Sequence, residues 1–230
     1  MTVISFLASH QGSLARAVIE GCASGRVPGG VGVVISNNGT SVVLERARAA
    51  GLRTAHLSSA THPDPEQLDR AIRTALEAVG TDLVVLAGYM KKVGPETLAA
   101  YSGRVVNVHP ALLPKHGGQG MYGSLVHRAV ALAGDTVSGA TVHLVTADYD
   151  RGPILEQRTV DLVPGDGADV IEAKVRAVER DLLVDVVARF ASTGSFEPTT
   201  APDEVPSVSG GVARGPGDPQ GPEDERHLER

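Results

Sequence analysis

Short apolar runs alternate with longer amphipathic segments through the first 110 residues of this 230-residue chain. The apolar runs have the length of strands, and the segments between them repeat apolar residues every three or four positions, which is typical of helices. The expected strands cover residues 3–8, 31–35, 54–57, 83–87 and 104–109, and the expected helices cover 14–23, 42–50, 65–79 and 95–101. This order predicts an α/β fold with a Rossmann-like, doubly wound and mostly parallel sheet.

The pattern changes in the second half of the chain. After an expected helix at 124–133, two alternating segments at 140–145 and 154–163 flank a polar turn. Such a pair predicts a hairpin-like, antiparallel edge of the sheet. Asp64 is expected to cap the helix at 65–79, and Asp166 is expected to cap a long helix that runs from 168 to 190.

The composition changes again near the carboxyl terminus. From Glu197 onward, Pro, Gly and charged residues dominate, and apolar residues are sparse. A segment of this composition cannot bury enough apolar surface to fold by itself. We therefore expect one domain at 1–196 and a disordered tail at 197–230.

Composition and charge narrow the possible function classes. The net charge is −6, no run of Lys or Arg stands out, and aromatic residues are 3% of the chain, which speaks against nucleic-acid binding. The single cysteine, Cys22, excludes an intrachain disulfide and suits a reducing cytoplasm. The first apolar run is too short for a signal peptide or a membrane span, so we expect a cytoplasmic protein without a membrane partner.

The strand expected at 104–109 has an unusual end. Asn107 and His109 are two positions apart, so their side chains project from the same face of the strand while Val108 turns into the core. Pro110 and Pro114 then stiffen the exit. These side chains are candidates for a site, although Asn107 could equally satisfy backbone groups and His109 could be a hydrogen-bonded core histidine.

Asp150 is the third candidate, because the turn between the two alternating segments can bring its carboxylate back over the edge of the sheet. A nearby carboxylate would raise the pKa of His109 and favour the imidazolium. An amide, an imidazolium and a carboxylate together suit the stabilisation of an oxyanion and the movement of a proton.

Other chemistries lack support in the sequence. There is no Gly-x-Ser-x-Gly turn for a serine nucleophile, and Cys22 has no histidine near it in sequence. No metal site is expected, because the histidines show neither His-x-x-x-His spacing nor a cysteine pair. The glycine-rich stretch 117–123 is either a flexible surface loop or a wall of the site, since it follows the Asn107–His109 strand directly.

The motif Asn107-x-His109-Pro-Ala-Leu-Leu-Pro, followed by His143-Leu-Val and by Asp150-x-Gly-Pro-Ile, resembles the folate-dependent formyltransferases. The resemblance covers about residues 1–192, and its spacing is most similar to members that formylate glycinamide ribonucleotide in de novo purine biosynthesis. It implies a small-molecule enzyme that takes 10-formyltetrahydrofolate as co-substrate and needs no metal. Asn107, protonated His109 and Asp150 would be its catalytic residues.

The same resemblance assigns the binding residues. The folate would be held by the loop Tyr89, Met90, Lys91, Lys92 and Val93 and, on the other side, by the backbone of Thr146 and Ala147. Gly12 and Ser13 match the turn that holds the substrate phosphate, and Arg176 and Glu179 match positions that contact substrate phosphate and ribose. The alternative for the last two is a surface ion pair.

The chain also departs from the family pattern. Its first turn reads Ser9-His10-Gln11-Gly12-Ser13, with a single glycine where relatives carry Gly-x-Gly-Ser-Asn. This change favours, as an alternative, an N-formyltransferase that acts on another amine, such as an amino sugar or a specialised metabolite. A non-catalytic ligand-binding relative is a further alternative, and the protein is expected to be a monomer or a homodimer.

Overall fold

The structure is a computed structural model in which residues 1–196 are described. The tail expected at 197–230 lies outside the described residues. The seven strands in this part of the chain are β1 (Thr2–Ala8), β2 (Gly29–Ser36), β3 (Arg53–His56), β4 (Leu83–Leu86), β5 (Val105–His109), β6 (Val137–Leu144) and β7 (Ile154–Asp161). The helices are α1 (Ser13–Ala23), α2 (Val42–Ala49), α3 (Pro65–Glu77), α4 (Pro95–Ala100), α5 (Ser124–Ala133) and α6 (Ala168–Thr193).

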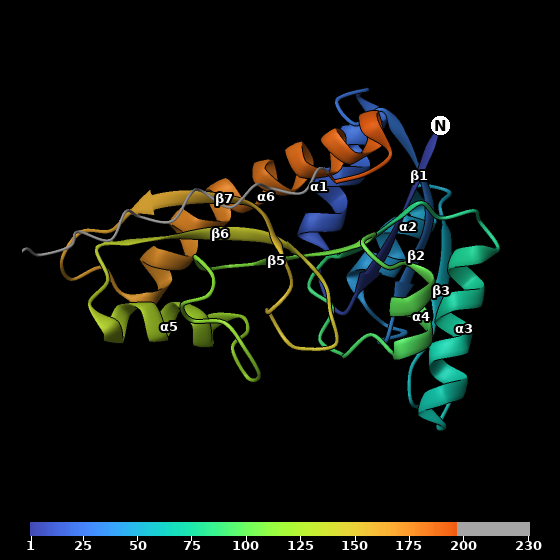
Figure 1. The fold of residues 1–230 in the computed structure, drawn as a ribbon, viewed down its shortest axis with the longest axis horizontal. Helices are drawn as coiled ribbons and strands as arrows, with labels where there is room; N and C mark the ends of the chain where they lie inside the picture. The colour runs from blue at the N-terminus through green and yellow to red at the C-terminus, as the bar shows by residue number, and fades with distance from the viewer. Residues whose placement is uncertain (197–230) are drawn as a thin grey trace, which may run out of the picture. The chain divides into compact units, whose positions relative to one another are not determined.

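The strands form one seven-stranded sheet in the order β3-β2-β1-β4-β5-β6-β7 (Figure 1). The pairs from β3 to β5 are parallel, whereas β5–β6 and β6–β7 are antiparallel. This confirms the predicted mostly parallel, doubly wound sheet with an antiparallel edge. The strand order reverses between β1 and β4, and in such sheets the carboxyl ends at the reversal are where ligands bind.

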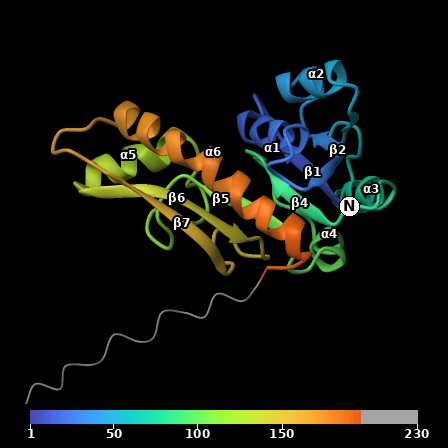
Figure 2. The same cartoon turned by 90° about the horizontal axis from the view of Figure 1, so that it is seen from above.

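Helices cover both faces of the sheet, as the apolar character of its central strands requires. One core joins α1, α2, α5 and α6 to the sheet, and the opposite core includes residues of α3 and Tyr101 just after α4. Helix α6 runs along the sheet from the β7 side to α1 in both views (Figures 1 and 2). Its apolar face therefore links the antiparallel edge to the amino-terminal half.

The starts of two helices test the predicted caps. At α3, the Asp64 carboxylate accepts a hydrogen bond from the Glu66 backbone N–H at 2.9 Å, which confirms the expected cap. At α6, the expected cap is wrong, because Gly167 occupies the N-cap position without a side-chain cap. Asp166 instead accepts from the Val163 backbone N–H and pairs with Lys174, so it closes the turn before the helix.

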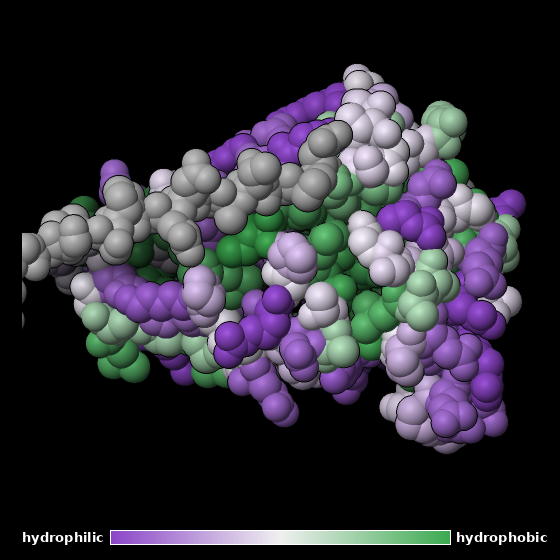
Figure 3. Space-filling model, viewed as in Figure 1, coloured by the Kyte–Doolittle hydropathy of each residue, from purple (hydrophilic) through white to green (hydrophobic). Residues whose placement is uncertain are grey.

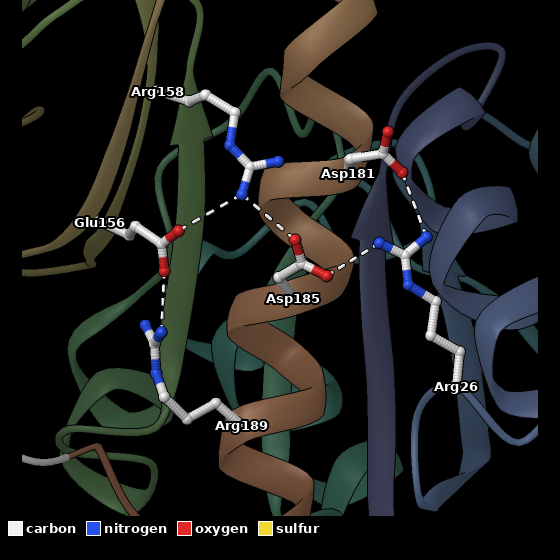
Figure 4. A network of polar contacts seen from close by, with 6 residues as sticks. All are labelled: Arg26, Glu156, Arg158, Asp181, Asp185 and Arg189. Atoms are coloured by element: carbon white, nitrogen blue, oxygen red, sulfur yellow. Dashed lines mark hydrogen bonds and ion pairs between the residues drawn. The ribbon is translucent and has the colours of Figure 1, made fainter.

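Ion pairs fasten the outer face of α6 to its neighbours (Figure 4). Asp185 binds Arg26, from the loop after α1, at 2.8 Å and Arg158 of β7 at 3.1 Å. Arg189 of α6 binds Glu156 of β7 at 2.8 Å. This set, which also includes Asp181, is called the α6 network below.

The outer surface is mixed in character. Figure 3 shows hydrophilic side chains over α3 and hydrophobic ones at the end of α5, where Leu132 is 90% exposed. Within residues 1–196, no helix combines the length and the apolar character that crossing a membrane would need.

Candidate active site

The candidate site begins where β5 and β6 lie side by side. Asn107 pairs in register with His143, and His109 with Thr141, so these side chains emerge from the same face of the sheet. Asn107 Nδ2 lies 3.2 Å from His143 Nε2, and His143 Nδ1 lies 2.9 Å from the Leu144 carbonyl oxygen. Because a carbonyl only accepts, Nδ1 of His143 carries a proton, and Nε2 lies where it can accept from the Asn107 amide.

His109 is fixed by a similar argument. Its Nε2 lies 2.9 Å from the His116 carbonyl oxygen, so Nε2–H is the donor, and its Nδ1 points toward Asp150 at 3.5 Å. The hydroxyl of Thr141 accepts from the Leu113 backbone N–H and donates to the Ala111 carbonyl, which holds the loop that follows the histidine. The 3% exposed His109 ring is therefore held on both edges.

Asp150 reaches this strand end from the loop between β6 and β7, as predicted. The residue has a left-handed φ of 54°, an unusual conformation for a residue other than glycine. Its Oδ2 accepts a hydrogen bond from the Gly118 N–H at 2.9 Å, and its Oδ1 lies 3.5 Å from His143 Nε2. One carboxylate thus stands between two imidazole nitrogens.

The charges of this cluster follow from burial and from these contacts. Burial works to raise the pKa of Asp150, but the contact with His143, the Gly118 N–H and the two imidazoles together lower it. The expected rise in the pKa of His109 is wrong: burial of its ring outweighs the attraction of Asp150 and lowers the pKa. The carboxylate is therefore the charged partner, and the free site favours a neutral imidazole at neutral pH.

A cavity with an empty volume of about 470 Å³ opens beside this cluster. Its walls include Asn107, His143 and Asp150, and His109 is not among its lining residues. The other lining residues come from the end of β4, the loop after it and the loop between β6 and β7: Leu86, Tyr89, Lys91, Lys92, Val93, Val145, Thr146, Ala147, Asp148 and Tyr149. All predicted folate-loop side chains except Met90 thus share one cavity with two of the three predicted catalytic residues.

The polar contacts around the cavity join its loops. The buried Ser9 hydroxyl donates to Asn37 Oδ1 at 2.6 Å and accepts from the Met90 N–H at 2.8 Å. The turn after β1 therefore supports the loop after β4. Across the cavity, the Lys92 ammonium lies 5.7 Å from the centre of the Tyr149 ring, a cation–π contact between the two loops.

The predicted phosphate and ribose residues lie on two helices that pack together, α1 and α6. Gly12 has a left-handed φ of 64°, and a Cβ there would approach Val43 Cγ2 to 2.3 Å, so the turn requires glycine. Ser13 is the exposed first residue of α1, which has no side-chain cap. Arg176 is exposed and pairs with Glu172 rather than with Glu179, while burial raises the pKa of Glu179 to about 7.

Metal ligation finds no support in this part of the chain. Among residues 1–196, no three or more His, Cys, Asp or Glu side chains converge in a way that could hold an ion. The cluster around Asp150 instead combines one amide, one carboxylate and two imidazoles. This set can stabilise a negatively charged oxygen and can receive a proton.

Two residues of the site were not predicted as site residues. His143 is part of the family motif, and its alternating position on the strand that pairs with β5 is a usable signal. Ser9 was treated as a departure from the family turn, and no sequence signal showed that its hydroxyl would join two loops. The contacts of His143 and of Ser9 both depend on which strands are neighbours in the sheet.

Comparisons with known proteins give the family context. A family profile described as "Formyl transferase" matches residues 2–187. The phosphoribosylglycinamide formyltransferase of Escherichia coli (strain K12) is 36% identical over 188 residues, which cover 82% of this chain and 86% of that protein. The protein of the same name from Mycobacterium tuberculosis (strain CDC 1551 / Oshkosh) is 39% identical over 189 residues, covering 82% of this chain and 84% of the relative.

A solved structure gives the same picture. Glycinamide ribonucleotide transformylase 1 from Symbiobacterium toebii superposes with a TM-score of 0.78 at 38% identity, covering 84% of this chain and 89% of the other. The resemblance drawn from the two sequence motifs is confirmed.

Proposed function

Since this chain belongs to the formyl transferase family, we propose that it transfers a formyl group from 10-formyltetrahydrofolate to the primary amine of glycinamide ribonucleotide in de novo purine biosynthesis. The observation that carries the proposal is the cavity in which Asn107, His143 and Asp150 face the loop after β4. The two curated relatives named above, which match most of this chain, bear the name of this activity.

The cavity is the proposed site of the folate co-substrate, which supplies the formyl group. It combines apolar side chains such as Leu86, Val93 and Val145 with the polar groups of Asn107 and Asp150. Tyr89, Lys91 and Lys92 would line one side of the ring system, and the backbone of Thr146 and Ala147 the other. Met90 would contribute through its backbone, which Ser9 holds in place.

Asn107 is placed to stabilise the charge that develops on the formyl oxygen. One hydrogen of its amide is used by His143 Nε2. The second hydrogen of the same nitrogen is free to point into the cavity that Asn107 lines. A fixed donor of this kind acts where charge appears and needs no reorganisation during the reaction.

The cluster around Asp150 is placed to receive the proton that the attacking amine loses. In its neutral form, His109 presents the lone pair of Nδ1 toward the carboxylate at 3.5 Å. A proton that the amine loses would be taken up at Nδ1 of His109, where the neighbouring Asp150 carboxylate would stabilise the imidazolium. The proton can afterwards be returned to the leaving nitrogen, so no proton is gained or lost overall.

The acceptor amine is the least constrained part of the proposal. The uncapped start of α1 at Gly12 and Ser13 offers backbone N–H groups to a phosphate, and Arg176 and Glu179 would contact phosphate and ribose. The hydroxyl of Ser9, however, is used by Asn37 and Met90. This observation favours, as the second candidate, an N-formyltransferase for another amine, such as an amino sugar.

A direct assay separates these functions. The purified chain is incubated with 10-formyltetrahydrofolate and either glycinamide ribonucleotide or a panel of amino-sugar nucleotides. Saturable turnover with glycinamide ribonucleotide supports the proposal, whereas turnover with an amino sugar alone supports the second candidate. Binding of the folate without turnover of any amine indicates a non-catalytic relative.

The cellular location, the oligomeric state and the bounds of the catalytic domain are also proposals. The single cysteine, Cys22, suits a reducing compartment, and we propose the cytoplasm. The protein is proposed to act as a monomer or a homodimer, and residues 1–196 are proposed to be the catalytic domain. Analytical ultracentrifugation and activity of a chain that ends at residue 196 test these two points.

A further inference from the structure

The start of the glycine-rich loop touches both members of the His109–Asp150 pair. The His116 carbonyl accepts from His109 Nε2 at 2.9 Å, and the Gly118 N–H donates to Asp150 Oδ2 at 2.9 Å. Two loop residues therefore hold the imidazole and the carboxylate from outside the cavity. The conformation of this loop therefore affects the positions of both His109 and Asp150.

His116 is itself held in an unusual way. Its φ is 56°, in the left-handed region that few residues other than glycine adopt. Its side chain leaves the site and binds Asp135, with His116 Nε2 2.8 Å from Asp135 Oδ2. Both side chains are nearly buried, at 13% and 14% exposed, and the other oxygen of Asp135 pairs with Lys115. The backbone conformation that aims the carbonyl at His109 is therefore locked by a side-chain contact on the far side.

The charge of Asp135 strengthens its contact with His116. Hydrogen bonds from Lys115 and from His116 lower the pKa of Asp135, so its carboxylate stays ionised at neutral pH. A charged acceptor makes a stronger bond to the imidazole N–H than a neutral one. The contact is therefore suited to hold a strained residue in one orientation.

From these contacts we infer that His116 and Asp135 are a positioning pair, which fixes the orientation and the tautomer of His109 through the His116 carbonyl. The inference rests on the proposed function for its kinetic consequences. With the carbonyl in place, His109 keeps its proton on Nε2 and turns the Nδ1 lone pair to Asp150. Without it, the ring can carry the proton on Nδ1 and donate it to the carboxylate, which blocks the place where the amine proton must go.

Two variants remove the pair in different ways. Asp135→Ala removes the acceptor of His116, while Asp135→Asn keeps an oxygen for it and serves as the conservative rescue. His116→Gly keeps the backbone carbonyl and relieves the left-handed strain, so it removes only the anchoring side chain. Asp166→Ala is the matched control, because Asp166 is 15% exposed and also pairs with a lysine, Lys174, but does not touch the loop.

The kinetic result expected for Asp135→Ala and His116→Gly is a fall in kcat of about 10-fold or more, with KM changed less than about 2-fold, as for other residues that orient a functional histidine. Asp135→Asn is expected to retain most of kcat, and Asp166→Ala to match the unmodified protein. Unchanged kcat in both Asp135→Ala and His116→Gly overturns the inference, as does an equal fall in Asp166→Ala.

Nuclear magnetic resonance provides a readout that needs no turnover. Two-bond ¹H–¹⁵N spectra at neutral pH are expected to show His109 with its proton on Nε2, the resonance being assigned by its loss in His109→Ala. In Asp135→Ala and His116→Gly the ring nitrogens are expected to move toward averaged shifts. A fixed Nε2–H tautomer in both variants overturns the inference. If the unmodified protein forms no formylated ribonucleotide, the proposed function fails while this spectrum still decides the positioning role.

Discussion

The α6 network and the cluster around Asp150 use similar residue types under opposite conditions. In the α6 network, carboxylates meet arginines at 2.8–3.4 Å, and the side chains are 29–60% exposed (Figure 4). Around Asp150, the contacts to His109 and His143 are 3.5 Å long, while the three side chains are 3–11% exposed. The exposed ion pairs of the α6 network are therefore shorter than the buried contacts of Asp150.

The difference agrees with the roles that we propose for the two regions. Water screens the exposed pairs and competes for their hydrogen bonds, so good geometry there adds little free energy. In the buried cluster, water is largely excluded and each charge or lone pair has a strong effect on its neighbours. The proton transfer that we propose there would use Nδ1 of His109 beside the Asp150 carboxylate.

Asp150→Asn is expected to lower kcat by about 10³-fold, because an amide cannot receive the amine proton or stabilise a protonated imidazole beside it. Steady-state kinetics with glycinamide ribonucleotide measure the effect. Thermal unfolding of the same variant separates loss of function from loss of fold. Retention of more than about a tenth of the activity would show that the proton leaves by another route.

His143→Phe is expected to lower kcat by about 10²-fold. The phenyl ring fills the same space but takes away the acceptor that orients the Asn107 amide and one of the two imidazoles beside Asp150. His143→Gln, which can still accept from the amide, is the comparison and should lose less. Equal losses in the two variants would argue that the ring shape, and not its nitrogen, matters.

Glu179→Gln tests a titration near neutral pH. Burial raises the pKa of Glu179 to about 7, so the group is a carboxylate above that pH and a neutral acid below it. If the carboxylate accepts hydrogen bonds from the ribose, KM for the ribonucleotide should rise several-fold as the pH falls from 8 to 6, and the Gln variant should show a flatter profile. Measuring KM for both proteins across this interval decides the point; parallel profiles contradict it.

Asp185→Asn should have the smallest effect. The change weakens the α6 network at its most connected carboxylate, yet exposed ion pairs contribute at most about 1 kcal/mol each. A fall of about 2–4 °C or less in the unfolding temperature is expected, with kcat unchanged. A loss of activity as large as that in Asp150→Asn would remove the distinction between the two regions.

Much of the fold could be predicted because it depends on local patterns. Apolar runs of strand length separated by amphipathic segments specify alternating strands and helices, and the Asp64 cap was visible as a local motif. The cap expected from Asp166 failed because a nearby chain segment, Val163, and Lys174 compete for the same carboxylate. A local sequence pattern does not show which of several possible hydrogen-bond partners a side chain will bind once the chain has folded.

Some features of the site could likewise be predicted from the sequence, and others could not. The placement of Asn107 and His109 on one face follows from strand alternation, and the same-face rule holds in the structure. The partnership of His143 with Asn107 depends on the register between β5 and β6, which no local pattern specifies. The lowered pKa of His109 depends on how deeply its ring is buried, and the expectation from charge alone had the wrong sign.

The sequence by itself determined the order of the strands along the chain and the polar strand end at Asn107 and His109. It also determined the family through two spaced motifs, because both alternation and motif spacing are properties of neighbouring residues. The tertiary structure decided that Asp150 stands between two imidazoles, that the His109 ring is buried, and that Asp135 binds His116. These features arise from burial and from contacts between distant segments, and both exist only once the chain has folded.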